Sequence, residues 1–190
     1  EDPHIGLAEP DDLARDWDGD ALEPADPADE PDPAALQEAA LRAEAAAQSH
    51  SGISQVQSSS AGYGRRRIHL SASNGFSGGY TRTDNGLSCV AITGTGSEME
   101  RDYDGDFRVF ASDMRSPEEI GHQAALRTLE LAGERKPTTG SFPVLFDERI
   151  SSSLIVHLLA ASNGTNIARG ASWLRDAMDQ PVLPDALSLT

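Results

Sequence analysis

The stretch FPVLFDERISSSLIVHLLAASNGTNIARGASWLRD, residues 142–176, contains the strongest structural signals of this 190-residue chain. The short apolar run at residues 142–146 predicts a buried strand. Residues 151–161 predict a helix whose side chains are nearly all apolar, and such a helix belongs in the interior of a domain. His157 is the one titratable side chain within these eleven residues, so the search for a functional group starts with it.

Two further helices are predicted upstream and one downstream. Asp32 is a suitable N-cap and Pro33 suits the first helical position, so an alanine-rich helix should begin there and end near His50. The sequence Ser116-Pro117-Glu118-Glu119 is typical of a capping box and predicts a second helix as far as about Ala132. Residues 171–178 predict one more short helix.

Residues 53–111 have the alternating pattern of antiparallel strands. Asn74-Gly75 predicts a hairpin turn, and Asp84-Asn85-Gly86 predicts a second turn. The acidic run 102–106 is interpreted as a solvated turn, followed by a strand at residues 107–111. The order of these elements predicts an α+β fold with a largely antiparallel sheet packed with helices.

The predicted domain organisation has three parts. Residues 1–33 contain more than a third of the 31 acidic residues and more than half of the 11 prolines, a composition that favours an extended acidic linker or, alternatively, an interaction arm. Residues 34–141 form the α+β portion. Residues 142–190 begin a further region, and we expect the chain to be a fragment of a longer protein.

Composition limits the classes of function. The formal net charge is −16, whereas a DNA-binding protein usually presents a basic surface, so nucleic acid is not an expected partner even though Arg65-Arg66-Arg67 is a basic cluster. No apolar run is long enough to span a membrane, and no signal peptide is visible. The single cysteine, Cys89, is expected to be a small buried residue in a cytoplasmic protein.

Three phrases of the sequence resemble the TldD/PmbA family, and its PmbA (TldE) branch most of all. They are SNGFSGGYTRT at residues 73–83, MERDYDGD at residues 99–106, and the stretch 142–176 that contains FPVLFD and NGTNIARGASWLRD. Some proteins of this family are called modulators of DNA gyrase. The resemblance implies a two-component cytoplasmic peptidase that degrades small or unfolded peptides, in which the TldD-type subunit binds the metal through a His-Glu-x-x-x-His motif.

This sequence departs from that motif. Aligned on the flanking phrases, the first histidine of the motif is His157, the glutamate is replaced by Leu158 and the second histidine by Ser162. A hydrolytic zinc site needs about three protein ligands and a carboxylate that activates water. We therefore predict no catalytic residue, no metal site and no cofactor in this chain. His157 is expected to be a buried, hydrogen-bonded side chain.

The resemblance leads to one functional hypothesis, and the composition allows another. In the first, the chain belongs to a PmbA/TldE-like subunit that is inactive alone, holds a peptide along strand edges, and forms an oligomer with a TldD-like subunit that supplies zinc. In the second, it is a protein-binding or assembly module that uses its acidic arm and strand edges without any link to proteolysis. A metallopeptidase with ligands outside this stretch is a third, weaker alternative.

Overall fold

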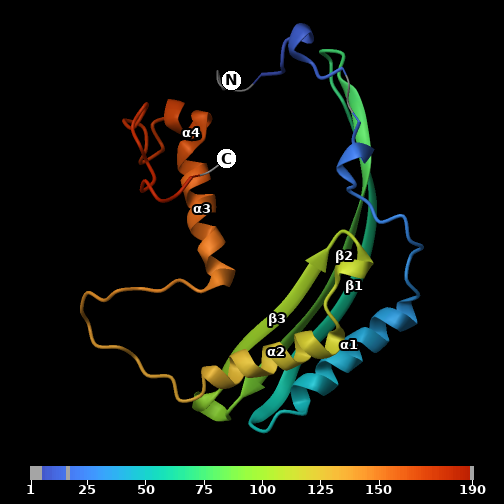
Figure 1. Ribbon diagram of the computed structural model, residues 1–190, viewed down its shortest axis with the longest axis vertical. Helices are drawn as coiled ribbons and strands as arrows, with labels where there is room; N and C mark the ends of the chain where they lie inside the picture. The colour runs from blue at the N-terminus through green and yellow to red at the C-terminus, as the bar shows by residue number, and fades with distance from the viewer. Residues whose placement is uncertain (1–5, 16–17, 189–190) are drawn as a thin grey trace. The chain divides into compact units, whose positions relative to one another are not determined.

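The computed structural model describes residues 6–15 and 18–188 and divides into two compact units, residues 8–137 and residues 138–190 together with the first seven. The larger unit has the antiparallel sheet that the sequence predicts, with strands β1 (Ile53–Ser71), β2 (Ser77–Thr93) and β3 (Glu100–Arg108) in the order β1-β2-β3. Helices α1 (Pro33–Gln48) and α2 (Pro117–Glu130) lie side by side on one face of that sheet (Figure 1). The α+β prediction is therefore confirmed.

The two helices begin at the predicted residues for the predicted reasons. The carboxylate of Asp32 accepts a hydrogen bond of 2.8 Å from the amide of Ala34, which caps α1. Ser116 and Glu119 form the capping box of α2, each side chain accepting from the backbone amide of the other. These caps satisfy amides that the first helical turn leaves without a partner.

Small residues allow the two helices to touch. Ala43 and Ala47 of α1 are completely buried, and Gly121 of α2 lies directly against the backbone of Ala43. A β-carbon at position 121 would stand only 2.0 Å from the carbonyl oxygen of Ala43. Alternate residues of β2 complete the core beneath the helices, with Leu87, Cys89 and Ala91 buried.

The hairpin is longer than predicted, and two predicted turns are wrong. The turn at Asn74-Gly75 is present, with Gly75 at φ +95°, but Asp84-Asn85-Gly86 lies inside β2, where it pairs with residues 62–64 of β1. Residues 102–106 are also not a turn; they lie within β3 and pair with β2. Of the expected strand at 107–111, only residues 107 and 108 are strand, as the end of β3; the rest is wrong, because residue 111 begins a 3-10 turn at Ala111–Asp113.

The acids of β3 stay in the strand because arginines from α2 and the segment before it neutralise them. The carboxylates of Asp104 and Asp106 are buried, 3% and 6% exposed. Arg115 bonds to Asp104 at 2.8 Å, and Arg127 makes a second ion pair with the same carboxylate. Burying a carboxylate requires such a partner. A local sequence pattern could not indicate these ion pairs, because the arginines lie many residues away from the aspartates in the chain.

The acidic N-terminal segment lies along the part of β2 that β3 does not reach. The carbonyl of Pro24 accepts a bond of 3.2 Å from the amide of Thr83, and the amide of Asp26 donates to the Thr83 hydroxyl at 2.7 Å. The carboxylate of Asp26 accepts from the amides of Ala28 and Ala111. Two 3-10 turns, Pro10–Asp12 and Asp20–Leu22, interrupt this segment, whose positions 1–5 and 16–17 lie outside the described residues.

The smaller unit differs most from its prediction. Helix α3 (Glu148–Ser162) confirms the predicted helix and is followed by the short α4 (Gly164–Ala168). The predicted strand at residues 142–146 is wrong, because these residues form no strand and Leu145 is 98% exposed. The predicted helix at 171–178 is also wrong, since these residues form turns. Most apolar side chains of α3 are exposed, and only Leu158 and Ala161 are buried, against Leu174.

Replacing Gly121 tests the contact between the helices. Alanine normally favours a helix interior over glycine by about 1 kcal/mol, but at this site the new methyl group would meet the Ala43 carbonyl. We expect Gly121→Ala to lower the free energy of unfolding by about 1–3 kcal/mol, measured by urea denaturation. Gly64→Ala is the control, because a β-carbon there meets nothing within 4 Å. Equal stability of the two variants would contradict this packing.

Asp26 should make the docking of the N-terminal segment sensitive to acid. The amides of Ala111 and Ala28 donate to its carboxylate and lower its pKa from the ordinary value of 3.8. Because the pKa is lower in the folded state, the stabilisation is complete above the ordinary value and is lost as pH falls through the folded-state pKa. We expect the amide proton resonances of Ala28 and Ala111 to shift upfield in that window and in Asp26→Ala at neutral pH. Asp29→Ala, at an exposed position, should leave both resonances unchanged.

Candidate functional site

The face of the sheet opposite α1 and α2 carries a hollow lined by residues of all three strands. Because Thr83, Asn85 and Leu87 are buried toward the helices, the residues between them in β2 face the other way. Gly86 of β2 pairs with Gly62 of β1 and with Phe107 of β3. The glycine pair leaves the backbone uncovered on this face.

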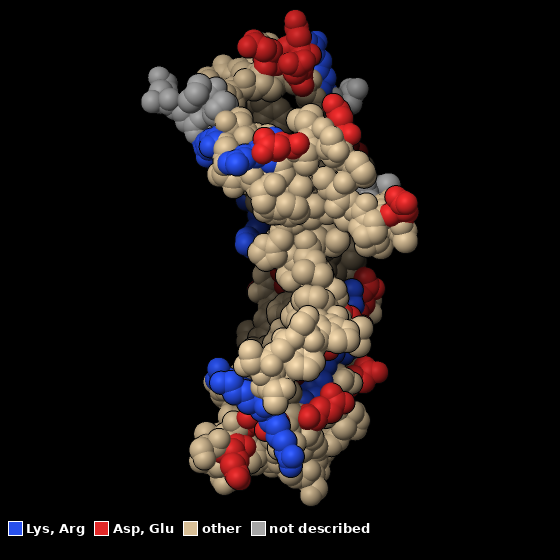
Figure 2. All heavy atoms as spheres, turned by 90° about the vertical axis from the view of Figure 1, so that its left-hand side faces the viewer, with Lys and Arg blue, Asp and Glu red and all other residues tan. Residues whose placement is uncertain are grey.

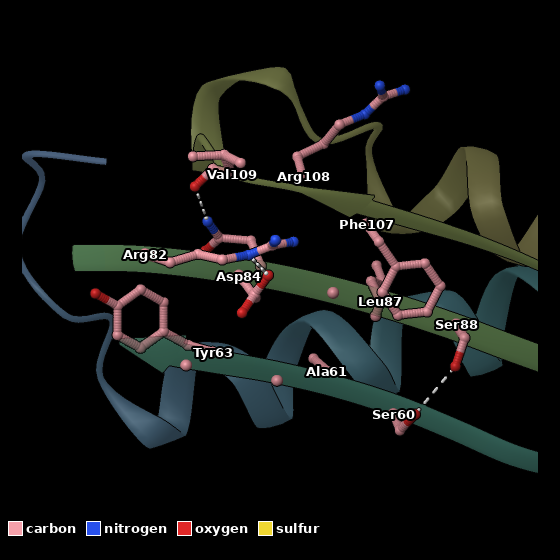
Figure 3. A pocket seen from close by; sticks show the side chains of 14 residues that line it. Ser60, Ala61, Tyr63, Arg82, Asp84, Leu87, Ser88, Phe107, Arg108 and Val109 are labelled. Carbon is pink, nitrogen blue, oxygen red and sulfur yellow. Dashed lines mark hydrogen bonds and ion pairs between the residues drawn. The ribbon is translucent and has the colours of Figure 1, made fainter. Parts of the chain in front are cut away.

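An aromatic side chain stands over Gly86. A β-carbon at Gly86 would lie 2.8 Å from Cδ1 of Phe107, so the ring can rest on β2 only because position 86 has no side chain. Figure 3 shows the ring of Phe107 reaching from β3 toward β2, while Arg108 points away from the strands. Phe107 remains 73% exposed, which leaves one side of its ring available to a ligand.

The hollow has a volume of about 470 Å³, within the range of small-molecule and peptide side-chain sites. Its apolar end is formed by Phe107 and the glycines, and its polar end by Arg82 and Asp84. The hydroxyl oxygen of Tyr63 is buried and has no hydrogen-bond partner among the described residues. Tyr63 pairs with the buried Asn85, so its side chain is on the helix-covered side of the sheet and only its backbone borders the hollow.

Two arginines share one carboxylate on this face. Arg66 bonds to Asp84 at 2.6 Å and Arg82 bonds to the same carboxylate at 2.9 Å. These two hydrogen bonds, that from Arg66 first, lower the pKa of Asp84 from its ordinary value. The cluster therefore carries a formal charge of about +1, although Figure 2 shows that basic and acidic side chains are interspersed on the face it displays.

The three positions of the family motif lie at the end of α3 in the smaller unit. His157 is exposed and has no hydrogen-bond partner among the described residues, so the expectation that it is buried is wrong. Leu158 is buried against Ala161 and Leu174. The hydroxyl of Ser162 donates a bond of 2.9 Å to the carbonyl of Leu158 one turn earlier.

These three side chains do not fit a zinc ion. Leucine provides no ligand and no general base, and the serine hydroxyl is used within its own helix. Nowhere in residues 6–15 and 18–188 do three His, Cys, Asp or Glu side chains come together in a way that could hold a metal. The absence of a metal site from α3 stays a prediction that rests on the residue types at positions 158 and 162.

Sequence reasoning located some site residues and missed others. Cys89 is buried as predicted, and burial, with a smaller contribution from Glu44, raises the pKa of its thiol to about 11, so it is unsuited to be a nucleophile. None of the basic cluster 65–67 lines the hollow, but Arg66 bonds to Asp84, which does. Phe107 and Asp84 were missed, since both were assigned to turns or strand starts. The pairing of Gly62 with Gly86 was the available signal, because glycines within strands mark close approaches.

Comparison with known proteins identifies the family. Residues 26–132 match the PmbA/TldA metallopeptidase central domain, and residues 139–190 match the C-terminal domain of the same family. The chain is 32% identical over 190 residues to the metalloprotease PmbA of Escherichia coli O157:H7, covering 99% of this chain and 41% of that protein. The chain belongs to the PmbA/TldA metallopeptidase family.

A second curated relative also matches the chain, and two solved structures share its fold. The metalloprotease PmbA homolog of Haemophilus influenzae is 29% identical over 62% of the chain and 26% of its own length. Crystal structures of proposed modulators of DNA gyrase share the fold. That from Thermotoga maritima has a TM-score of 0.69 at 18% identity over 77% of this chain and 34% of its own. The structure from Bacteroides thetaiotaomicron has a TM-score of 0.67 at 24% identity, and the match covers 96% of this chain and 43% of that one.

The chain thus spans about two-fifths of the length of the Escherichia coli protein and a quarter of the Haemophilus protein. The name given to the two curated relatives places the family among peptide hydrolases. Among the helices of the described residues, none combines the length and the apolar character needed to cross a bilayer.

The shared carboxylate gives a prediction for the hollow. The Asp84 side chain should titrate below its ordinary value of 3.8 because Arg66 and Arg82 both stabilise its charged form. Arg66→Gln should raise the titration midpoint, measured by carbonyl-carbon NMR, and Arg82→Gln should raise it less. Arg67→Gln is the matched control, because this neighbouring residue of β1 alternates to the other face of the sheet. A midpoint that moves equally in all three variants would contradict the arrangement.

Proposed function

We propose that this chain is part of a PmbA/TldE-like subunit that holds peptide for a metallopeptidase complex and does not itself bind the catalytic zinc. The observation that carries the proposal is the pair of replacements on α3, Leu158 and Ser162. Both belong to a helix that forms normally, so the helix is retained while the groups for water activation are absent. In this proposal a TldD-like partner supplies the metal and the general base.

The local structure of α3 supports a role without hydrolysis. Adjacent residues of a helix are about 100° apart around its axis. The side chain of Leu158 points toward Ala161 and Leu174 and packs on them. The side chain of His157 therefore points in another direction, and the residue is exposed. A single exposed imidazole lacks the further ligands and the carboxylate that a hydrolytic zinc site uses.

The hollow on the open sheet face is the candidate for peptide contact. Gly62 and Gly86 are paired within the sheet, so the hollow offers side chains: Phe107 offers an apolar surface, and the cluster of Arg66, Arg82 and Asp84 offers a positive charge close by. An extended peptide forms backbone hydrogen bonds at a strand edge and places alternate side chains in pockets. This arrangement favours a peptide whose apolar side chain meets Phe107 and whose carboxylate meets the arginines.

The surface of the smaller unit supports assembly with another subunit. Exposed apolar side chains of α3 include Leu154, Val156 and Leu159, which are 46%, 62% and 52% exposed. Apolar surface of this kind marks interaction sites. We further propose a cytoplasmic location, which suits the free, buried Cys89 because reducing compartments keep thiols unpaired.

The exposed faces also fit the second hypothesis, a binding module without any link to proteolysis. Its acidic segment would need to be free for a partner, but Pro24 and Asp26 are bonded to the chain's own Thr83. This contact favours the first hypothesis, in which the sheet face and α3 rather than the acidic segment make the interactions.

Reconstitution tests the proposed function. The chain and a TldD-type partner are purified separately, and zinc content and hydrolysis of an unstructured peptide are measured for each and for the mixture. We expect hydrolysis only in the mixture, with the zinc that hydrolysis requires bound by the partner, because α3 of this chain lacks the glutamate and the second histidine. Phe107→Ala should raise the KM of the mixture several-fold without loss of zinc, because an aromatic contact contributes about 0.5–1.5 kcal/mol. Phe142→Ala, at another exposed phenylalanine, is the control for that effect.

Two results would contradict the proposal. One is stoichiometric zinc bound by this chain alone with hydrolysis that requires His157. The other is hydrolysis by the partner at the same rate and KM whether or not this chain is added.

A further inference from the structure

A pair of histidines joins the end of α1 to α2, away from the open face of the sheet. His50 follows the last turn of α1, and His122 lies in the second turn of α2. Nε2 of His50 stands 2.7 Å from Nδ1 of His122, and the ring centroids are 4.5 Å apart with the planes tilted by 54°. Seventy-two residues separate the two histidines in the chain, so only the fold brings them together.

We propose that His50 and His122 form a binding site for a divalent transition-metal ion such as Zn²⁺ or Ni²⁺, which would link α1 to α2. The two facing nitrogens now share one hydrogen bond, in which one ring donates and the other accepts. When the proton moves to the remote nitrogen of the donating ring, both facing nitrogens present lone pairs. The ion then takes the place of the shared proton.

The distance between the two facing nitrogens is close to the distance between two nitrogen ligands of one bound ion. Imidazole nitrogens lie about 2.0–2.1 Å from such a metal, which places two ligands of one ion roughly 2.9–3.4 Å apart for ligand angles between about 90° and 110°. The observed 2.7 Å needs to open by only a few tenths of an ångström. Rotation of two side chains at the surface, where His122 is exposed and His50 half-buried, provides this movement.

The backbone beneath both rings is held in place. The amide of His50 donates to the carbonyl of Ala47, and its own carbonyl accepts from the amide of Ile53 at the start of β1. His122 follows Gly121, which is in contact with the backbone of Ala43. Two ligands fixed by a helix–helix contact lose little freedom when they bind an ion.

The ligand chemistry selects the class of ion. Imidazole suits zinc, copper, nickel and iron, whereas magnesium and calcium prefer oxygen ligands. Glu118 lies one turn before His122 on α2, but its carboxylate is bound at both oxygens by Arg42. The site thus has two protein ligands, with water completing the coordination, and the net charge of −16 favours the approach of cations.

Titration calorimetry of the purified chain with NiCl₂ and ZnCl₂, and with MgCl₂ as the control ion, tests the proposal. We expect the chain to bind one Ni²⁺ or Zn²⁺ through both histidines and to bind no Mg²⁺. His50→Ala and His122→Ala should each lower the affinity for Ni²⁺ or Zn²⁺ by at least about tenfold. His69→Ala is the matched control, because this exposed histidine bonds only to nearby serines in the described structure. His122→Gln keeps a hydrogen-bonding side chain but should bind as weakly as His122→Ala.

A direct measurement on the unsubstituted chain guards against misfolded variants. Addition of Zn²⁺ should shift the ring-nitrogen NMR signals of His50 and His122 together, and saturating Zn²⁺ should raise the Tm of the chain but not of His122→Gln. Absence of binding, or binding that survives both alanine substitutions, would overturn this proposal. Binding that is lost only in His157→Ala would overturn it as well and would contradict the proposed function, whereas failure of the peptidase reconstitution would leave this test unaffected.

Discussion

A single row of side chains along β2, from Thr83 to Thr93, holds the larger unit together. Every second residue from Thr83 to Thr93 is buried on the side of the sheet that carries α1 and α2, and apart from Leu87 these residues are small or polar, so the helices can approach closely. The polar residues at the two ends of this row, Thr83 and Thr93, are buried and form hydrogen bonds with other segments of the chain. Thr83 binds the N-terminal segment, and the Thr93 hydroxyl donates to the carbonyl of Gly52 at 2.7 Å.

The same constraint produces the open face. Since helices cover one side of the sheet, the alternate residues of β2 must face the other side, and there the chain has glycines, serines and the Asp84 cluster in place of a second core. Phe107 rests on β2 because Gly86 leaves room for it. The candidate peptide site is thus a consequence of one-sided packing combined with glycine at two paired positions.

The two units differ in how much of their apolar surface is satisfied within the chain. In residues 8–137 the main apolar groups are buried around Ile120 and Cys89. In the smaller unit only a small cluster around Leu158 forms, and large side chains such as Trp173 are 71% exposed. Membership of a family whose relatives are more than twice as long agrees with this difference, and it is why α3 is proposed to be completed by other parts of an assembly.

Local chemistry in the sequence was sufficient for the starts of α1 and α2, the turn at Asn74-Gly75, the burial of Cys89 and the loss of two motif residues at positions 158 and 162. Each of these depends on residues within a few positions of one another. Tertiary structure decided that Asp84 and Asp104 remain in strands, because Arg66 and Arg115, which bond to them, come from other parts of the fold. It also decided that the run at 142–146 is no strand, since pairing partners and burial are long-range properties. The contact between His50 and His122 belongs to the same class, because it exists only where two helices, distant in the chain, cross.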